Sequence, residues 1–250
     1  YYKGAMAAEF MNQLGYDGMT VGNHEFDDGP EVLRGFVDTV NFPVLMSNAD
    51  ISGEELLSGA IEKSTIIERG GEQIGLIGLT PENTDELASP GPNVIFTPAA
   101  DAVQAEVDRL TAEGVNKIIV LSHSGYNADL AIAEATTGVD VIVGGHSNTY
   151  LGDDEDAAGL YPTMVGDTAI VQAYAYGKFL GELNVTFDDA GVLTEASGAP
   201  LLIDGNVAED ADAVARIAEL AAPLEEVRNR VVASTADTID GNRDVCRTME

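Results

Sequence analysis

The sequence predicts an α/β fold in which helices cover a mainly parallel sheet and a second sheet lies beside it. Helical and strand patterns alternate along the first 150 residues. A helical segment separates the apolar runs 116–121 and 139–143, so these runs are expected to form parallel strands of one sheet. Further strand patterns at 169–175, 180–187 and 200–203 are joined by short turns. Short connections predict antiparallel pairing, and hence a second sheet.

The other elements follow from periodicity and from turn residues. A helix is expected from about residue 30 because Pro30 suits a first helical turn. Gly70-Gly71 predicts a hairpin between its two flanking strands. In chain order, the expected elements are a helix over 4–14, a strand over 18–21, a loop over 22–28, a helix over 30–40, a strand over 42–47, the hairpin strands 63–69 and 73–79, helices over 98–113 and 128–136, and a long helical stretch over 209–232.

Composition excludes several classes of function. The 250 residues include 43 acidic and 12 basic ones, giving a net charge of −31, which repels nucleic acid polymers and anionic membranes. No apolar run approaches the roughly 20 residues of a membrane helix. The acidic run 152–159 lacks the ligand spacing of a calcium loop and is interpreted as an exposed loop. Cys246 is either free or paired with a cysteine outside this sequence.

The three histidines occupy equivalent positions in the chain. His24, His123 and His146 each follow directly on a short apolar strand. Loops at the carboxyl ends of parallel strands share one edge of a sheet, where ligands bind. His123 and His146 belong to one strand–helix–strand unit, so their side chains can converge. The alternative is that each histidine only satisfies loop backbone, but their shared position and polar neighbours favour a site.

The residue types favour an open metal site. Imidazole suits zinc and similar cations, whereas amide oxygens suit harder ones, so a His/Asn set favours zinc or manganese over calcium. Two histidines with amides are unlike a closed structural zinc site. Asp27 lies three residues after His24 and can hold one ring nitrogen while the other faces substrate. The alternative for Asp27 is a helix N-cap before Pro30.

These segments resemble the 5′-nucleotidase family of calcineurin-like metallophosphoesterases. The resemblance is carried by GNHEFD at 22–27, SHSG at 122–125 and GGHSNT at 144–149. The flanking segments YKGAMAAEFMNQLGYDGMTVGNHEFDDG and VQAYAYGKFLGELNVTFD, and the tail CRTME, are similar as well. The resemblance implies a two-sheet sandwich flanked by helices (αββα) and two divalent metal ions, with zinc favoured and manganese, cobalt or magnesium as alternatives. It also implies a location outside the cytoplasm.

The resemblance also implies roles for individual residues. Asn23, His123 and His146 would ligate one metal, and Asn148 would ligate the other. His24 would contact the phosphate, Asp27 would orient His24, and Arg247 would face the substrate. The implied reaction is hydrolysis of nucleoside 5′-monophosphates to nucleoside and phosphate. Hydrolysis of UDP-sugars or of 2′,3′-cyclic nucleotides, and a metal-free scaffold, remain open as alternatives.

The resemblance further implies a division of the chain. Residues 1–205 would form the metal-binding domain, 206–235 a linker helix, and 236–250 the start of a substrate-binding domain. The family's first two metal-binding blocks are expected before Tyr1, and most of the second domain after Glu250. The oligomeric state is left open. The sequence by itself therefore predicts one half of a two-metal site.

Overall fold

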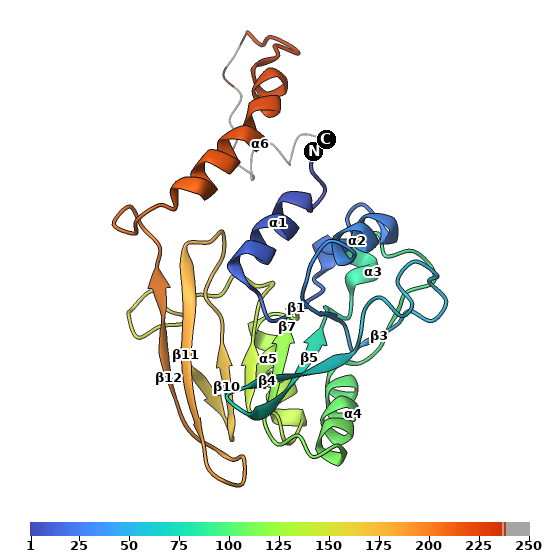
Figure 1. The fold of residues 1–250 in the computed structure, drawn as a ribbon, viewed down its shortest axis with the longest axis vertical. Coiled ribbons are helices and arrows are strands. Elements are labelled where there is room, and N and C mark those ends of the chain that lie inside the picture. The colour runs from blue at the N-terminus through green and yellow to red at the C-terminus, as the bar shows by residue number, and fades with distance from the viewer. Residues whose placement is uncertain (237, 239–250) are drawn as a thin grey trace. The chain divides into compact units, whose positions relative to one another are not determined.

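The computed structural model describes residues 1–236 and 238 of the 250-residue chain. The chain divides into two compact units, Tyr1–Ile203 and Asp204–Glu250. Among the described residues, the first unit contains every strand and every helix except α6 (Figure 1). The functional argument therefore concerns the first unit.

A six-stranded mixed sheet lies at the centre of the first unit, in the order β4-β5-β7-β8-β10-β9. Its strands are β4 (Ser64–Arg69), β5 (Glu72–Leu79), β7 (Ile118–Ser122), β8 (Val141–Val143), β9 (Thr163–Val165) and β10 (Thr168–Val171). Strands β5, β7, β8 and β10 are parallel, and β4 and β9 pair antiparallel at the two edges. The predicted 63–69/73–79 hairpin and the parallel pair at 116–121 and 139–143 are confirmed.

The pairing expected for the strand at 169–175 is wrong in part. This strand is β10, which ends at Val171 and pairs in parallel with β8, besides its antiparallel pairing with β9. All four of its residues are buried, as expected for a strand covered on both faces. The apolar character of the run, rather than the short connections after it, was the informative signal.

Three two-stranded ladders accompany the central sheet. They are β1 (Met19–Thr20) with β2 (Val44–Leu45), β3 (Ala49–Asp50) with β6 (Ile95–Phe96), and β11 (Phe179–Phe187) with β12 (Leu193–Leu202). The antiparallel β11–β12 hairpin matches the expectation for the later strands, but β12 begins well before the predicted residue 200. Small and polar residues over 194–198 hide its strand pattern.

The β1–β2 ladder packs directly against the central sheet. Thr20 Oγ1 accepts a hydrogen bond of 2.8 Å from the backbone N–H of Leu79, at the end of β5. Gly78 allows this approach, because a Cβ atom there would clash with the backbone of Leu45. A small parallel ladder therefore stacks on the central sheet, and the predicted two-sheet α/β fold is confirmed.

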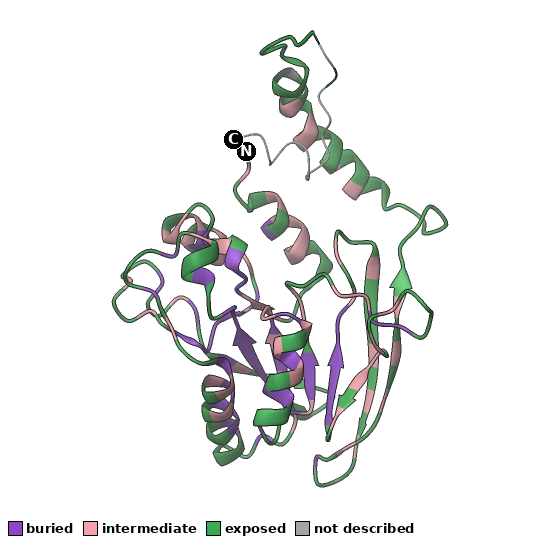
Figure 2. Ribbon diagram, turned by 180° about the vertical axis from the view of Figure 1, so that it is seen from behind, coloured by how far each residue is buried: buried purple, intermediate pink, exposed green. Residues whose placement is uncertain are grey.

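Helices complete the first unit. They are α1 (Ala5–Leu14), the 3-10 helix η1 (Asn23–Phe26), α2 (Pro30–Val37), α3 (Thr84–Leu87), α4 (Ala99–Ala112) and α5 (Tyr126–Ala135). Helices α4 and α5 pack on the central sheet through a buried core that includes Val103, Leu110 and Ile132. A second core, which includes Phe26 and Leu33, surrounds β1–β2 and α2. Figure 2 shows the central strands buried over most of their length and the β11–β12 hairpin largely exposed.

The described part of the second unit contains one long helix, α6 (Ala211–Asn229). The Asp210 side chain caps it by accepting a 2.8 Å hydrogen bond from the backbone N–H of Ala213. Among the described residues, no helix is both long enough and apolar enough to cross a membrane.

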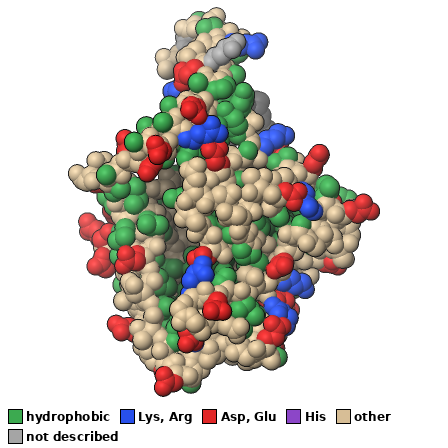
Figure 3. Space-filling view, in the orientation of Figure 1, with side chains coloured by type: hydrophobic (Ala, Val, Ile, Leu, Met, Phe, Trp, Pro, Cys, Tyr) green, Lys and Arg blue, Asp and Glu red, His purple; other side chains and the backbone are tan. Residues whose placement is uncertain are grey.

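Figure 3 shows acidic side chains spread over the visible face of the molecule rather than gathered in one patch, as expected for a solvated acidic surface.

Candidate active site

The strands β7 and β8 bring His123 and His146 together. The two strands are parallel neighbours in the central sheet, so the loops that follow them leave the same edge. His123 directly follows β7, and His146 lies in the loop after β8. The centroids of their rings are 5.2 Å apart. The convergence expected from one strand–helix–strand unit is therefore present in the structure.

Asn23 joins these two histidines from the other ladder. It follows β1 and begins η1, and only 3% of its surface is exposed. Its Oδ1 atom lies 3.1 Å from Nδ1 of His146. Gly22, the residue before Asn23, lets the backbone pass close to the ring of His123, because a Cβ atom at position 22 would lie 2.9 Å from Nε2 of His123. Two imidazoles and one buried amide thus come together at this edge of the sheet.

The electrostatics of this cluster favour neutral imidazole rings. Burial, followed by the charges of His146 and His24, lowers the pKa of His123 to about 4. Burial and the charge of His24 lower the pKa of His146 in the same direction. A neutral imidazole offers a nitrogen lone pair, which is the form that binds a metal.

His24 and Asp27 form a hydrogen-bonded pair beside the cluster. Nδ1 of His24 lies 2.8 Å from Oδ2 of Asp27, and 74% of the histidine side chain is exposed. The bond holds the ring through Nδ1 and leaves Nε2 available to an external group. Asp27 is not the N-cap of α2, because that position is taken by Gly29. The interpretation of Asp27 as a partner of His24 therefore agrees with the geometry, and the N-cap alternative is wrong.

Asn148 is the ligand predicted for the second metal ion. It lies two residues after His146 in the same loop, and it is exposed. Among the hydrogen bonds of the described residues, none joins its side chain to Asn23, His123 or His146. His146 and Asn148 both have left-handed backbone conformations, with φ of 67° and 53°. Arg247 and Cys246 lie outside the described residues.

The donor set fits a divalent cation in part. Two neutral imidazoles and a buried amide oxygen are suitable ligands for borderline cations such as zinc or manganese. Within residues 1–236 and 238, no group of three His, Cys, Asp or Glu side chains comes together as a metal site. The cluster therefore fits a cation that takes additional ligands from elsewhere.

Sequence reasoning missed three residues that support the cluster. Glu25 Oε2 accepts a 2.7 Å hydrogen bond from the backbone N–H of Gly22, which shapes the turn before Asn23. Asp129 and Gln172 are buried behind the two histidine loops, and both bond to residues of those loops. A carboxylate in the first turn of α5 and a glutamine directly after a buried strand were the available signals.

Known proteins share these segments. Residues 4–150 match the family described as calcineurin-like phosphoesterase. The chain is 41% identical to a 5′-nucleotidase of Mus musculus and 42% identical to a snake venom 5′-nucleotidase of Naja atra. Both alignments cover all of this chain, but 46% and 50% of those proteins.

Solved structures show the same likeness. The fold is similar to a 5′-nucleotidase precursor from Thermus thermophilus, with a TM-score of 0.89 and 41% identity over 93% of this chain and 48% of that chain. It is also similar to an NAD nucleotidase from Haemophilus influenzae, with a TM-score of 0.82 and 26% identity over 92% of this chain and 55% of that chain. The chain spans about half the length of the curated relatives it matches.

Proposed function

The chain belongs to the calcineurin-like phosphoesterase family, and on that premise we propose that the full-length protein hydrolyses nucleoside 5′-monophosphates to nucleoside and phosphate. The observation that carries the proposal is the cluster of Asn23, His123 and His146 beside the His24–Asp27 pair. Relatives named 5′-nucleotidase, at about 40% identity over the whole chain, support the choice of substrate.

The proposed cofactor is a pair of divalent metal ions, with zinc favoured and manganese, cobalt or magnesium as alternatives. Asn23, His123 and His146 would hold one ion, and Asn148 would contribute to the other. When bound, such ions polarise phosphoryl oxygens and lower the pKa of water toward neutrality. The low pKa of His123 supports this assignment, because the ring is neutral and free to bind at physiological pH. Carboxylate ligands would come from outside the described residues.

His24 would act on the phosphate rather than on a metal. Its ring is exposed and is held through Nδ1 by Asp27, so Nε2 can reach a bound ester. A donor placed there stabilises the charge that develops on the phosphoryl oxygens during in-line displacement. Asp27 would keep the ring in the one orientation that directs Nε2 toward the ester.

The remaining assignments rest on the family alone. We propose that residues 1–205 form the metal-binding domain, 206–235 a linker, and 236–250 the start of the substrate domain, where Arg247 would face the substrate. A location outside the cytoplasm is proposed because several relatives are named as snake venom proteins. UDP-sugars and 2′,3′-cyclic nucleotides are the alternative substrates.

The test compares two histidine variants in the full-length protein. His24→Ala should lower kcat for AMP by about 10²- to 10³-fold while the bound metal stays at the wild-type level, because His24 stabilises charge in the transition state. His123→Ala should lose metal first. Activity is measured against AMP, UDP-glucose and 2′,3′-cyclic AMP, and metal content by atomic absorption. Loss of metal in His24→Ala would show that His24 is a ligand, and a preference for either other substrate would replace the proposed one.

A further inference from the structure

Gln172 binds both sides of the loop that carries His146 and Asn148. It directly follows β10 and is 3% exposed. Its Oε1 atom accepts a 2.5 Å hydrogen bond from the backbone N–H of Thr149 and a 3.2 Å bond from Oγ of Ser147. Its Nε2 atom donates to the backbone oxygen of Gly145 at 3.1 Å. One side-chain amide thus bridges the two ends of the 145–149 segment.

This loop requires such a restraint. His146 and Asn148 both have positive φ, a region that costs free energy for residues with a Cβ atom. Left-handed residues of this kind persist only where the surrounding structure holds them, and they concentrate at functional sites. The three hydrogen bonds from Gln172 act on Gly145, Ser147 and Thr149, which alternate with the two left-handed residues.

The same network reaches the loop that carries His123. Oγ of Ser147 accepts a 3.0 Å hydrogen bond from the backbone N–H of Tyr126, the first residue of α5. In the first turn of that helix, Asp129 accepts a 2.5 Å hydrogen bond from Oγ of Ser122, the residue before His123. Ser122 Oγ in turn accepts from the backbone N–H of Ser124 at 3.1 Å. The start of α5 therefore ties the two histidine loops to each other.

We propose that Gln172 is a positioning residue that holds His146 and Asn148 in the geometry needed to bind divalent cations. It acts through backbone and hydroxyl groups of the loop and does not itself bind metal. The inference rests on the proposed function, because it assigns Gln172 to the same metal site. Side chains that support metal ligands without touching the metal orient those ligands, and the loss of such a side chain typically weakens metal affinity by about 10- to 100-fold.

The test uses Gln172→Met in the full-length protein, which keeps the volume and removes all three hydrogen bonds. The affinity for Zn²⁺ alone should fall by about 10- to 100-fold. The visible absorption of the protein loaded with Co²⁺ alone should change in energy or intensity. In metal-free protein, the amide of Thr149 should exchange its hydrogen faster because it loses its acceptor. Ser147→Ala removes one of the three contacts with Gln172 and also the hydrogen bond from the N–H of Tyr126. It should weaken Zn²⁺ binding as well, and it serves if Gln172→Met does not fold.

Gln104→Met is the matched control. Gln104, on α4, holds backbone in a similar way, because its Oε1 accepts from the N–H of Thr137 at 2.8 Å and its Nε2 donates to Thr137 O at 3.3 Å. Thr137 follows the other end of α5, away from the histidine loops. Gln104→Met should reduce stability and leave the Zn²⁺ affinity within about twofold of wild type, since it leaves the ligands in place.

Two results would overturn the inference. Zn²⁺ affinity in Gln172→Met within about twofold of wild type would show that the loop keeps its geometry without Gln172. An equal loss of affinity in Gln104→Met would show that reduced stability, and not positioning, is responsible. Failure of the wild-type protein to bind any of Zn²⁺, Mn²⁺, Co²⁺ and Mg²⁺ would refute the proposed function together with this inference. Normal wild-type binding with unchanged Gln172→Met refutes this inference alone.

Discussion

Replacing Asp129 with asparagine is expected to change how the stability of the protein depends on pH. Asp129 is completely buried in the first turn of α5. Its Oδ1 atom accepts the hydrogen bond from Ser122, and within the described part of the chain its Oδ2 atom has no hydrogen-bond partner. Burial raises the pKa of this carboxyl group from 3.8 to about 7, against the opposing effect of the Ser122 hydrogen bond. The neutral acid is therefore the favoured form in the folded protein below neutral pH.

The direction of the effect follows from where the proton is bound. The carboxyl group ionises near pH 3.8 in the unfolded chain and near pH 7 in the folded protein. Between these values the folded protein binds the additional proton, so the free energy of unfolding falls as the pH rises. The difference between the two pKa values corresponds to about 4 kcal/mol, at about 1.36 kcal/mol for each pH unit. Asparagine does not titrate. As the pH rises across this range, the free energy of unfolding of Asp129→Asn should therefore increase by up to about 4 kcal/mol relative to that of the wild type.

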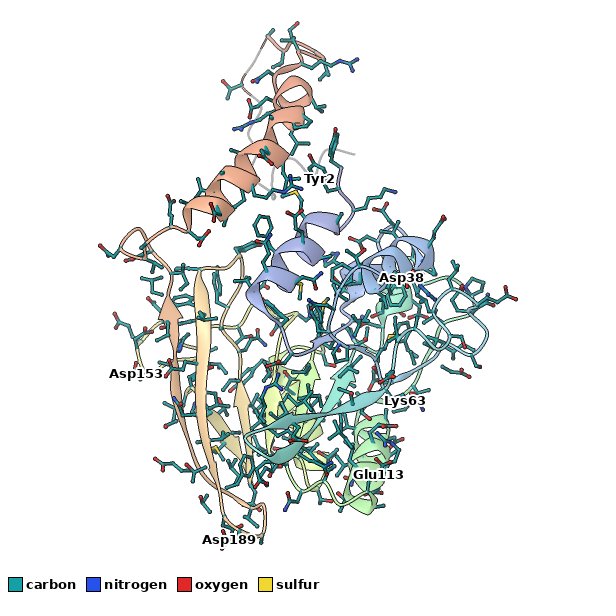
Figure 4. All side chains as sticks on the ribbon, in the orientation of Figure 1. Tyr2, Asp38, Lys63, Glu113, Asp153 and Asp189 are labelled. Atoms are coloured by element: carbon teal, nitrogen blue, oxygen red, sulfur yellow. The ribbon has the colours of Figure 1, made fainter. Side chains whose placement is uncertain are left out.

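The assay is urea unfolding of the metal-free full-length protein, followed by circular dichroism from about pH 4.5 to about pH 8, with a check that the transition is two-state. At each pH, the free energy of unfolding of the wild type is subtracted from that of the variant, which removes the contribution of all other titrating groups. Asp189→Asn is the control, because it makes the same change at an exposed site at the end of the β11–β12 hairpin (Figure 4). A constant difference for Asp129→Asn over the same range would refute the argument that burial keeps this carboxyl group protonated.

Two glycine substitutions test the close contacts around the site. Gly78→Ala would drive Cβ into the backbone of Leu45, so the free energy of unfolding should fall by about 1–3 kcal/mol or more. Gly35→Ala is the control, because a Cβ atom added at this position of helix α2 meets no neighbouring atom within 4 Å. It should raise the free energy of unfolding by up to about 1 kcal/mol. Equal effects in urea unfolding would contradict the packing of β2 against β5. Gly22→Ala would place Cβ 2.9 Å from Nε2 of His123, so it should weaken Zn²⁺ affinity by about tenfold or more, as a displaced ligand does. Unchanged affinity in a titration would show that the ring can move without cost.

Much of the candidate site could be predicted from the sequence because its signals are local. Each histidine is adjacent to the apolar run that forms its strand, and the order strand–helix–strand requires β7 and β8 to be parallel. His24 and Asp27 lie within one turn of backbone, so their contact depends on little else. The short strands β3 and β6 and the helix α3 could not be predicted, because two to four residues are too few to show a periodicity.

The pairing of β10 shows the limit of local patterns. The sequence predicts an apolar strand over 169–175, but the choice between β8 and a later strand as its neighbour depends on the packing of the whole sheet. That choice decides the position of Gln172. Its contacts with Gly145, Ser147 and Thr149 exist only because β10 lies next to β8.

The sequence by itself determined the fold class, the positions of the three histidines at the ends of strands, and the pairing of His24 with Asp27. Only the tertiary structure decided that Oδ1 of Asn23 lies beside Nδ1 of His146, and that Gln172 and Asp129 support the histidine loops from behind. The physical reason is that periodicity records which side of an element is buried, whereas contacts between elements depend on the order and stacking of strands that are distant in the chain.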